Sequence, residues 1–247
     1  MKLIATKKAK HKITLVLTLS AAFIISYLFA FFYAKTATDT YSKVFSSDIC
    51  VVIDAGHGGF DSGTVGADGI TLEKDINLDI ANRVNAMLTA FGINTVTVRE
   101  VDKSVESDST LKHKSAKISD IKNRLALAES TDNSVLLSIH QNHYSDPDIN
   151  GAQVFYSSNN PSSAVLAQQI QDSIVNLVQP ENKRSIKEST SSIYILDKAS
   201  VPAVMVECGF LSNYNELQQL KSKDYRKKIA FSIVIGVLEY LKQTEEV

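Results

Sequence analysis

The sequence predicts an α/β domain with a largely parallel, twisted mixed sheet of about six strands and helices on both faces. An N-terminal hydrophobic helix precedes it. The first observation is that short runs rich in Val, Ile and Leu are bounded by turn formers, as buried strands are. The second is that these runs alternate with longer segments whose apolar residues recur every three or four positions. Strands alternating with helices indicate a parallel sheet covered by helices.

The N-terminal segment from Ile13 to Ala34 is apolar and contains no acidic residue. Five lysines precede it: Lys2, Lys7, Lys8, Lys10 and Lys12. Roughly 20 apolar residues suffice to cross a bilayer, whereas the apolar part of a secretory signal is usually shorter. The positive-inside rule then places the rest of the chain outside the cytoplasm. We expect residues 1–34 to be a signal anchor in the membrane, with a cleaved signal peptide of a secreted protein as the alternative.

Residues 35–48 are polar and small, which predicts a tether, and residues 49–245 form the expected domain. The net charge of the whole chain is −1, and without the five N-terminal lysines it becomes about −6. No basic stripe is present, which argues against nucleic acid as a partner. We interpret Cys50 and Cys208 as small buried residues, and a bridge between them is the alternative if their strands are neighbours.

The first half of the domain contains two predicted strands and two predicted helices. A glycine-rich loop follows the first strand, and a charged stretch without periodicity predicts a long loop before the second helix. In order, the expected elements are a strand from Cys50 that ends before His57, a helix over 72–91, a strand over 93–98, a loop over 101–117 and a helix over 118–129.

The second half repeats this alternation. Its first helix carries Leu166, Ile170, Ile174 and Leu177 at helical spacing. In order, the expected elements are strands over 134–140 and 151–156, a helix over 162–178, a polar loop over 179–192, a strand over 202–206, a short helix over 215–220 and a final helix over 224–243.

Three of the predicted strands carry, at or just beyond their ends, a residue that can hold or use a metal: His57, His140 and Glu207. Ligands collect at the carboxyl ends of strands in open α/β sheets. Catalytic zinc takes three protein ligands and keeps one position for water. Glu73 opens the helix after the glycine-rich loop and is the best third ligand. Zinc would lower the pKa of bound water to about 7, and Glu207 would carry the proton to the leaving group.

Each feature also has a purely structural interpretation when it is taken singly. A histidine at a strand end is more often a hydrogen-bonded structural residue than a ligand. The glycine-rich loop could bind phosphate, but it lacks the lysine of a P-loop and the spacing of a dinucleotide site. The convergence of all four residues at one sheet edge favours the metal site.

Four strings resemble, in order and spacing, the zinc-dependent N-acetylmuramoyl-L-alanine amidases. They cover about residues 50–243 and read VVIDAGHGGFDSGTVG, LEKDINLDIA, SIHQNHYSD with GAQVFY following, and VPAVMVECGFLSN. The resemblance implies that His57, Glu73 and His140 bind Zn²⁺ and that Glu207 is the catalytic carboxylate. It also implies hydrolysis of the amide bond between the lactyl group of muramic acid and L-alanine in peptidoglycan.

The architecture looks most like the germination-specific amidases of spore-forming bacteria. That narrower resemblance implies a role in cortex maturation through muramic-δ-lactam, in the space around the developing spore. A vegetative cell-wall amidase, a non-catalytic peptidoglycan-binding scaffold and another zinc peptidase are the alternatives. The chain lacks the HExxH helix that is common among zinc peptidases. The need for an accessory protein stays open.

Three further residues are candidates for contacting substrate or supporting the ligands: Asn142, Asp54 and Arg124. Asn142 matches the S-I-H-x-N pattern of the family, although an asparagine in a turn would look the same. Asp54 could hydrogen-bond a ligating imidazole or cap the backbone. Arg124 lies on a helix where the family often carries arginine, and a solvated charge is the alternative. His143 replaces a usually small residue, and we expect it at the surface or supporting the site.

Overall fold

The computed structural model describes residues 7–44, 48–106, 110 and 112–245, without the side chains of 7–11, 33–44, 113 and 245. The chain divides into two compact units, Met1–Ser46 and Ser47–Val247. We describe each unit by itself.

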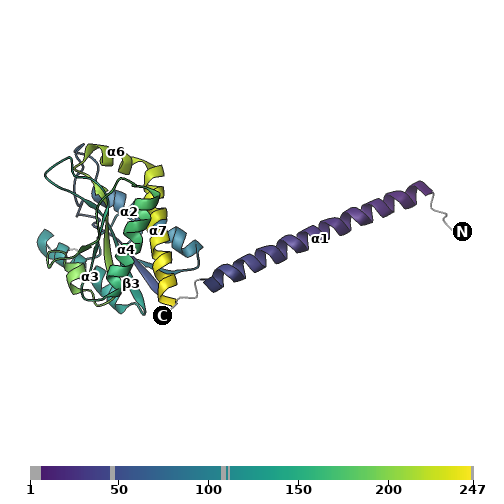
Figure 1. Ribbon diagram of the computed structural model, residues 1–247, viewed down its shortest axis with the longest axis horizontal. Helices are drawn as coiled ribbons and strands as arrows, with labels where there is room; N and C mark the ends of the chain where they lie inside the picture. The colour runs from purple at the N-terminus through teal and green to yellow at the C-terminus, as the bar shows by residue number, and fades with distance from the viewer. Residues whose placement is uncertain (1–6, 45–47, 107–109, 111, 246–247) are drawn as a thin grey trace. The chain divides into compact units, whose positions relative to one another are not determined.

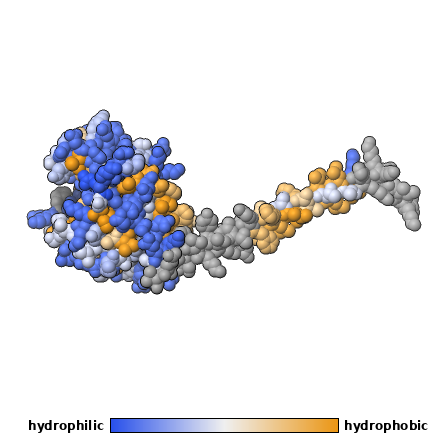
Figure 2. Space-filling model, in the orientation of Figure 1, coloured by the Kyte–Doolittle hydropathy of each residue, from blue (hydrophilic) through white to orange (hydrophobic). Residues whose placement is uncertain are grey.

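The described residues of the first unit form one helix, α1 (Lys7–Val44), drawn in purple in Figure 1. Its segment Lys12–Phe32 is long and apolar enough to cross a membrane. Figure 2 shows this stretch in orange, and its side chains are exposed. The helix continues through residues 35–44 of the expected tether. Of the expected basic flank, Lys2 and the side chains of Lys7, Lys8 and Lys10 lie outside the described part of the chain.

The second unit is built on one six-stranded sheet in the order β2-β1-β3-β6-β4-β5. Four neighbouring strands are parallel: β2 (Asn94–Thr97), β1 (Cys50–Ala55), β3 (Ser134–Asn142) and β6 (Ala203–Phe210). β4 (Gln153–Tyr156) runs antiparallel to β6, and the short β5 (Lys187–Glu188) is parallel to β4. The predicted mixed, largely parallel sheet is thus confirmed.

Helices cover both faces of this sheet (Figure 1). On one face, α7 (Lys223–Glu245) packs between α2 (Glu73–Ala90) and α4 (Ser162–Leu177). On the other, α3 (His113–Ser130) packs against α5 (Tyr194–Lys198). Because successive side chains of a strand point to opposite faces, alternate residues of β1 face opposite helix layers. Val52, for example, belongs to the core cluster formed with α3 and α5. The remaining helix, α6 (Tyr214–Lys221), follows the end of β6.

A glycine allows α7 and α4 to approach closely. A Cβ added at Gly236 would lie 2.5 Å from Cα of Ile170, which is backbone and cannot move aside. Ile170 is fully buried there, as are Leu166 and Ile174. Leu177, at the same helical spacing, is the last residue of α4 and is 52% exposed.

Two local predictions are corrected by the structure. Helix α3 begins at His113, inside the stretch predicted to be a loop over 101–117. The predicted polar loop over 179–192 contains the two-residue strand β5, which pairs with β4 at the edge of the sheet and is too short to leave a periodic signal. Cys50 and Cys208 are both free, as the main interpretation expected, because β3 separates their strands; Cys208 is buried and Cys50 is half-buried.

Candidate metal centre

His57, Glu73 and His140 come together at the carboxyl end of the parallel strands. One ligand atom from each residue lies within 4.8 Å of the other two. Oε1 of Glu73 is 3.2 Å from Nε2 of His57 and 3.0 Å from Nδ1 of His140, and the two rings meet edge to face. Two imidazole nitrogens and one carboxylate oxygen are the donor set of many catalytic zinc sites. Three residues separated by as many as 83 positions in the sequence thus form one cluster that can hold a cation.

The loop after β1 presents His57 through a backbone held by two buried arginines. Arg99 donates from Nε to the carbonyl of Ala55 (2.8 Å) and from Nη2 to that of Gly56 (3.0 Å). Arg124 donates to the carbonyls of Ala55 (2.8 Å) and His57 (2.7 Å). Neither side chain is more than a few per cent exposed, so these bonds form out of water. They hold His57 at a φ of 61°, in the left-handed region.

Glu73 is held at the first turn of α2, almost fully buried at 2% exposure. Its Oε2 accepts from the backbone N–H of Thr64 (2.8 Å), and its Oε1 accepts from that of Gln141 (3.1 Å) and from the amide of Asn77 (3.2 Å). Burial alone would raise its pKa, but the hydrogen bonds and charges of His140 and His57 outweigh burial and hold the pKa far below its usual value. The carboxylate is therefore ionised and fixed in position, as a ligand must be.

Gly56 lets the first loop pass directly over His140. A Cβ at this position would lie 2.2 Å from Nε2 of His140, well inside contact distance. The glycine therefore leaves the space in which the His140 ring stands beside the ring of His57. Their centroids are 4.9 Å apart.

Asp61 supports His57 from the side opposite Glu73. Its Oδ2 is 2.8 Å from Nδ1 of His57 and 2.9 Å from Nζ of Lys117. Burial alone would lower the pKa of His57, but its bonds to Asp61 and Glu73 raise that pKa to about 9. The carboxylates of Asp61 and Glu73 thus favour a positive charge between them. A metal ion can supply this charge, since it displaces the proton from an imidazole that binds it. A carboxylate on the outer nitrogen also fixes the orientation of such a ring.

Glu207 lies next to the cluster on the neighbouring strand, where it is the register partner of His140. Its Oε2 is buried and makes no hydrogen bond to any described residue. Burial raises the pKa of Glu207 to about 7, with the Glu73 charge adding to burial and the His140 charge opposing it. It lines an open polar cavity of about 390 Å³ together with His57, Glu73 and His140. A buried carboxyl with a pKa near 7 beside a cation site is suited to moving a proton.

The three further candidates do different things. Both oxygens of Asp54 are used away from the imidazoles, accepting from Arg124 (2.5 Å) and from Ser138 (2.7 Å). Arg124 is buried and holds the His57 loop, so its interpretation as a solvated charge is wrong. Asn142 ends β3 and lines the polar cavity, and its Oδ1 accepts from the N–H of His143 (2.8 Å). His143 itself is exposed, as expected.

Sequence reasoning assigned no role at the site to Arg99, Asp61 and Lys117. Arg99 directly follows the alternating run INTVTV, so a charge just after a predicted strand was the available signal. Asp61 stands four residues after His57 in a loop, which has no fixed geometry from which to infer contact. Lys117 reaches Asp61 from α3, and nothing local in the sequence reports that pairing.

Comparison with known proteins agrees with the site. Residues 51–239 match the family model described as N-acetylmuramoyl-L-alanine amidase. The germination-specific N-acetylmuramoyl-L-alanine amidase of Bacillus subtilis is 31% identical over 193 residues, covering 78% of this chain and 80% of that protein. The amidase LytC of the same species is 32% identical over 194 residues, which cover 78% of this chain but 35% of LytC.

A solved structure shows the same fold. The CwlD amidase of Clostridioides difficile, in complex with the GerS lipoprotein, superposes with a TM-score of 0.74 at 34% identity, covering 78% of this chain and 98% of that chain. The family match spans the residues that form the His-Glu-His cluster. The chain therefore belongs to the N-acetylmuramoyl-L-alanine amidase family and is an amide hydrolase of peptidoglycan.

Proposed function

We propose that this amidase acts on spore cortex peptidoglycan, in the maturation that leads to muramic-δ-lactam and in germination. A relative supports this role in the cortex: the match to the germination-specific amidase of Bacillus subtilis covers most of that protein's length. LytC matches at similar identity, but the match covers 35% of LytC, whereas it covers 80% of the germination-specific amidase.

We assign His57, Glu73 and His140 as the ligands of one zinc ion. The observation that carries this assignment is the convergence of their three ligand atoms within 4.8 Å. Bound there, zinc would supply a Lewis acid and an activated water for attack on the lactyl carbonyl. The backbone donors on Glu73 and the carboxylate on His57 keep these side chains oriented before any ion arrives.

Glu207 is the group that moves the proton in this mechanism. Its free oxygen, Oε2, would accept a proton from the water that attacks the lactyl carbonyl and return it to the nitrogen of L-alanine as the amide bond breaks. Burial places the pKa of Glu207 at about 7, so both protonation states are accessible at neutral pH. Arg124 is a positioning residue, because it donates to the carbonyl of His57. Asp54 acts through Arg124, from whose guanidinium it accepts a hydrogen bond.

We further propose that α1 anchors the enzyme in a membrane as an uncleaved signal anchor. The apolar segment Lys12–Phe32 has the length that a bilayer requires. The catalytic unit would then act outside the cytoplasm, where its peptidoglycan substrate lies.

Digestion of two substrates tests the proposed function. Purified zinc-loaded enzyme is incubated with cortex sacculi and with vegetative sacculi, and newly exposed amino groups of L-alanine are identified by mass spectrometry. We expect faster release from cortex, with an intact lactyl carboxylate on the glycan. Equal or faster release from vegetative sacculi would contradict the cortex role, and no release from either would contradict the assigned site.

A further inference from the structure

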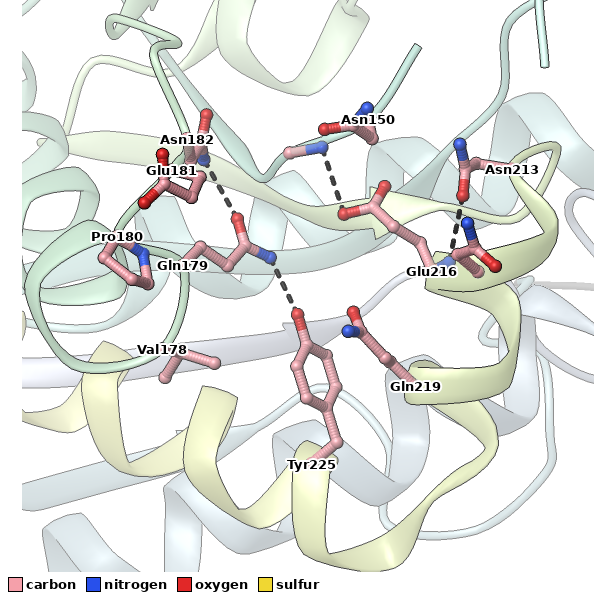
Figure 3. A pocket seen from close by; sticks show the side chains of 12 residues that line it. Asn150, Val178, Gln179, Pro180, Glu181, Asn182, Asn213, Glu216, Gln219 and Tyr225 are labelled. Carbon is pink, nitrogen blue, oxygen red and sulfur yellow. Dashed lines mark hydrogen bonds between the residues drawn. The ribbon is translucent and has the colours of Figure 1, made fainter. Parts of the chain in front are cut away.

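A second cavity lies at the same end of the sheet as the metal centre but is lined by other residues (Figure 3). It has a volume of about 340 Å³ and lies between the end of α4, α6 and the start of α7. Its lining is dominated by side-chain amides, and we call it the amide pocket. The residues are Asn150, Gly151, Val178, Gln179, Pro180, Glu181, Asn182, Asn213, Asn215, Glu216, Gln219 and Tyr225.

The floor of the amide pocket is a hydrogen-bonded network whose orientation is fixed by the backbone. Oε1 of Gln179 accepts from the N–H of Ala152 (2.8 Å), so its Nε2 must be the atom that faces Tyr225. That Nε2 donates to the Tyr225 hydroxyl at 2.8 Å, as Figure 3 shows. The Tyr225 oxygen is therefore an acceptor in this bond, and its own proton remains available.

The Tyr225 proton has no acceptor among the described residues, although the side chain is half-buried. Burial raises the pKa of Tyr225 to about 12, so the hydroxyl keeps that proton at neutral pH. Because half-buried donors in proteins are usually hydrogen-bonded, we expect the Tyr225 hydroxyl to donate to a molecule bound in the cavity.

Acceptors stand on the opposite side of the pocket. Glu216 is 8% exposed, and its two oxygens accept from the N–H groups of Gly151 (3.0 Å) and Phe210 (2.7 Å). Each carboxylate oxygen has a second lone pair, so the side chain can still accept from a ligand. The amides of Asn215 and Gln219 stand one helical turn apart on α6 and make no hydrogen bond to the described residues, so they offer both donors and acceptors.

The charge of the lining restricts the ligand. The twelve residues include two carboxylates, Glu181 and Glu216, and no lysine, arginine or histidine. Phosphates and carboxylate-rich peptides are therefore disfavoured, because anions are recognised by cationic groups. The pocket favours a neutral ligand that carries hydroxyl and acetamido groups side by side. It is of the size that small-molecule sites have.

The amide pocket is also within reach of a polymer bound at the metal centre. Phe210, whose N–H binds Glu216, lies three residues beyond Glu207 on β6, which corresponds to roughly 10 Å along a strand. Gly151 is two residues before Gln153, the register partner of Glu207 on β4. Both strands thus lead from Glu207 to the pocket.

We propose that the amide pocket binds a neutral N-acetylated sugar of the glycan strand and holds the strand while its stem peptide lies at the metal centre. The proposal rests on the proposed activity on peptidoglycan. The sugar accepts from Tyr225 and donates to Glu216, and its acetamido group pairs with the amides of α6. Sugar binding here is separate from hydrolysis, because none of the lining residues belongs to the metal cluster.

The test uses a probe that cannot be hydrolysed, a tetramer of N-acetylglucosamine, titrated calorimetrically into the full chain in detergent. Gln219→Ala is compared with Gln218→Ala, a matched control at the next residue, which is also exposed but lies outside the pocket. We expect Kd to rise several-fold for Gln219→Ala and about tenfold when Tyr225→Phe is added, since each substitution removes one hydrogen bond to the sugar. Gln218→Ala should bind like the unmodified chain.

Glu207→Gln separates this proposal from the proposed function. It should bind the tetramer normally while losing hydrolysis, so a failure of the catalytic assignment leaves the binding result intact. No binding by the unmodified chain, or equal Kd for Gln219→Ala and Gln218→Ala, would overturn the proposal. So would a stem peptide that competes with the tetramer and loses affinity in Gln219→Ala.

Discussion

At the scale of the residue, the site depends on a backbone conformation that His57 does not favour. Its φ of 61° costs roughly 1–2 kcal/mol relative to the right-handed region. Hydrogen bonds from Arg99 and Arg124 to the carbonyls of residues 55–57 offset this cost. The same conformation points the imidazole at Glu73, so local strain is coupled to ligand geometry.

Removal of one imidazole should remove the metal. His57→Ala deletes one of three protein ligands, so we expect zinc per chain to fall from about one to near zero after dialysis, as measured by atomic absorption. His143→Ala is the matched control, because that histidine is exposed and stands outside the cluster. Full zinc content in His57→Ala would remove this residue from the ligand set.

Glu207→Gln should separate metal binding from chemistry. The substitution preserves size but removes the proton acceptor, so we expect full zinc content and a loss of kcat of roughly 10²–10⁴-fold. Glu188→Gln, at an exposed position on β5, is the control and should keep kcat. The measurement is the rate at which L-alanine amino groups appear. Unchanged kcat in Glu207→Gln would show that another group carries the proton.

At the scale of the element, the sequence predicted the parts of the site that belong to strands and helix starts. His140 and Glu207 lie on buried strands whose apolar runs are visible in the sequence, and Glu73 opens a strongly periodic helix. The sequence does not predict equally well which elements become neighbours. The antiparallel β4, the pairing of Lys117 with Asp61 and the arginine bonds to the loop depend on tertiary contacts that leave no local pattern.

An ion-pair network joins α2 to α7 and provides a pH dependence. Asp79 accepts from Arg83 on its own helix (2.8 Å) and from Arg226 on α7 (2.6 Å). Burial alone would raise the pKa of Asp79, but these two bonds outweigh burial and lower it. A carboxyl with a lowered pKa in the folded state stabilises the fold above its unfolded pKa of about 3.9, and the contribution is lost as pH falls through the folded value.

Asp79→Asn should therefore destabilise the protein at neutral pH but not in strong acid. We expect the free energy of unfolding to fall by about 1 kcal/mol at pH 7, because the pairs are partly exposed. The difference should vanish once the pH falls below the lowered pKa of Asp79 in the folded state. Urea unfolding at several pH values measures both. Glu239→Gln, an exposed change on α7, is the control. A difference independent of pH would show that the charge of Asp79 is not the cause.

At the scale of the whole molecule, the long apolar segment and the candidate metal centre lie in different units. α1 carries the apolar segment Lys12–Phe32, whereas every residue assigned to the metal centre lies in the unit Ser47–Val247. The second unit has its own sheet and its own buried core. It is also the unit that contains the residues matched by the family model.

A chain that begins at residue 48 should accordingly stay folded and active. We expect it to purify without detergent, to bind one zinc ion and to keep the kcat of the full chain on solubilised muropeptides. The full chain, unlike the shortened one, should sediment with lipid vesicles, because about 20 apolar residues partition into a bilayer. Vesicle binding by the shortened chain would place the membrane contact in the catalytic unit.

The most direct test of the central claim is the anomalous X-ray scattering of zinc in crystals of the zinc-loaded protein. We expect one anomalous peak per chain within about 2.0–2.2 Å of a nitrogen of His57, a nitrogen of His140 and an oxygen of Glu73. The carboxylate of Glu207 should stand beside the peak without being bound to it. A peak at other residues, or none at saturating zinc, would contradict the assignment of this cluster as the metal centre.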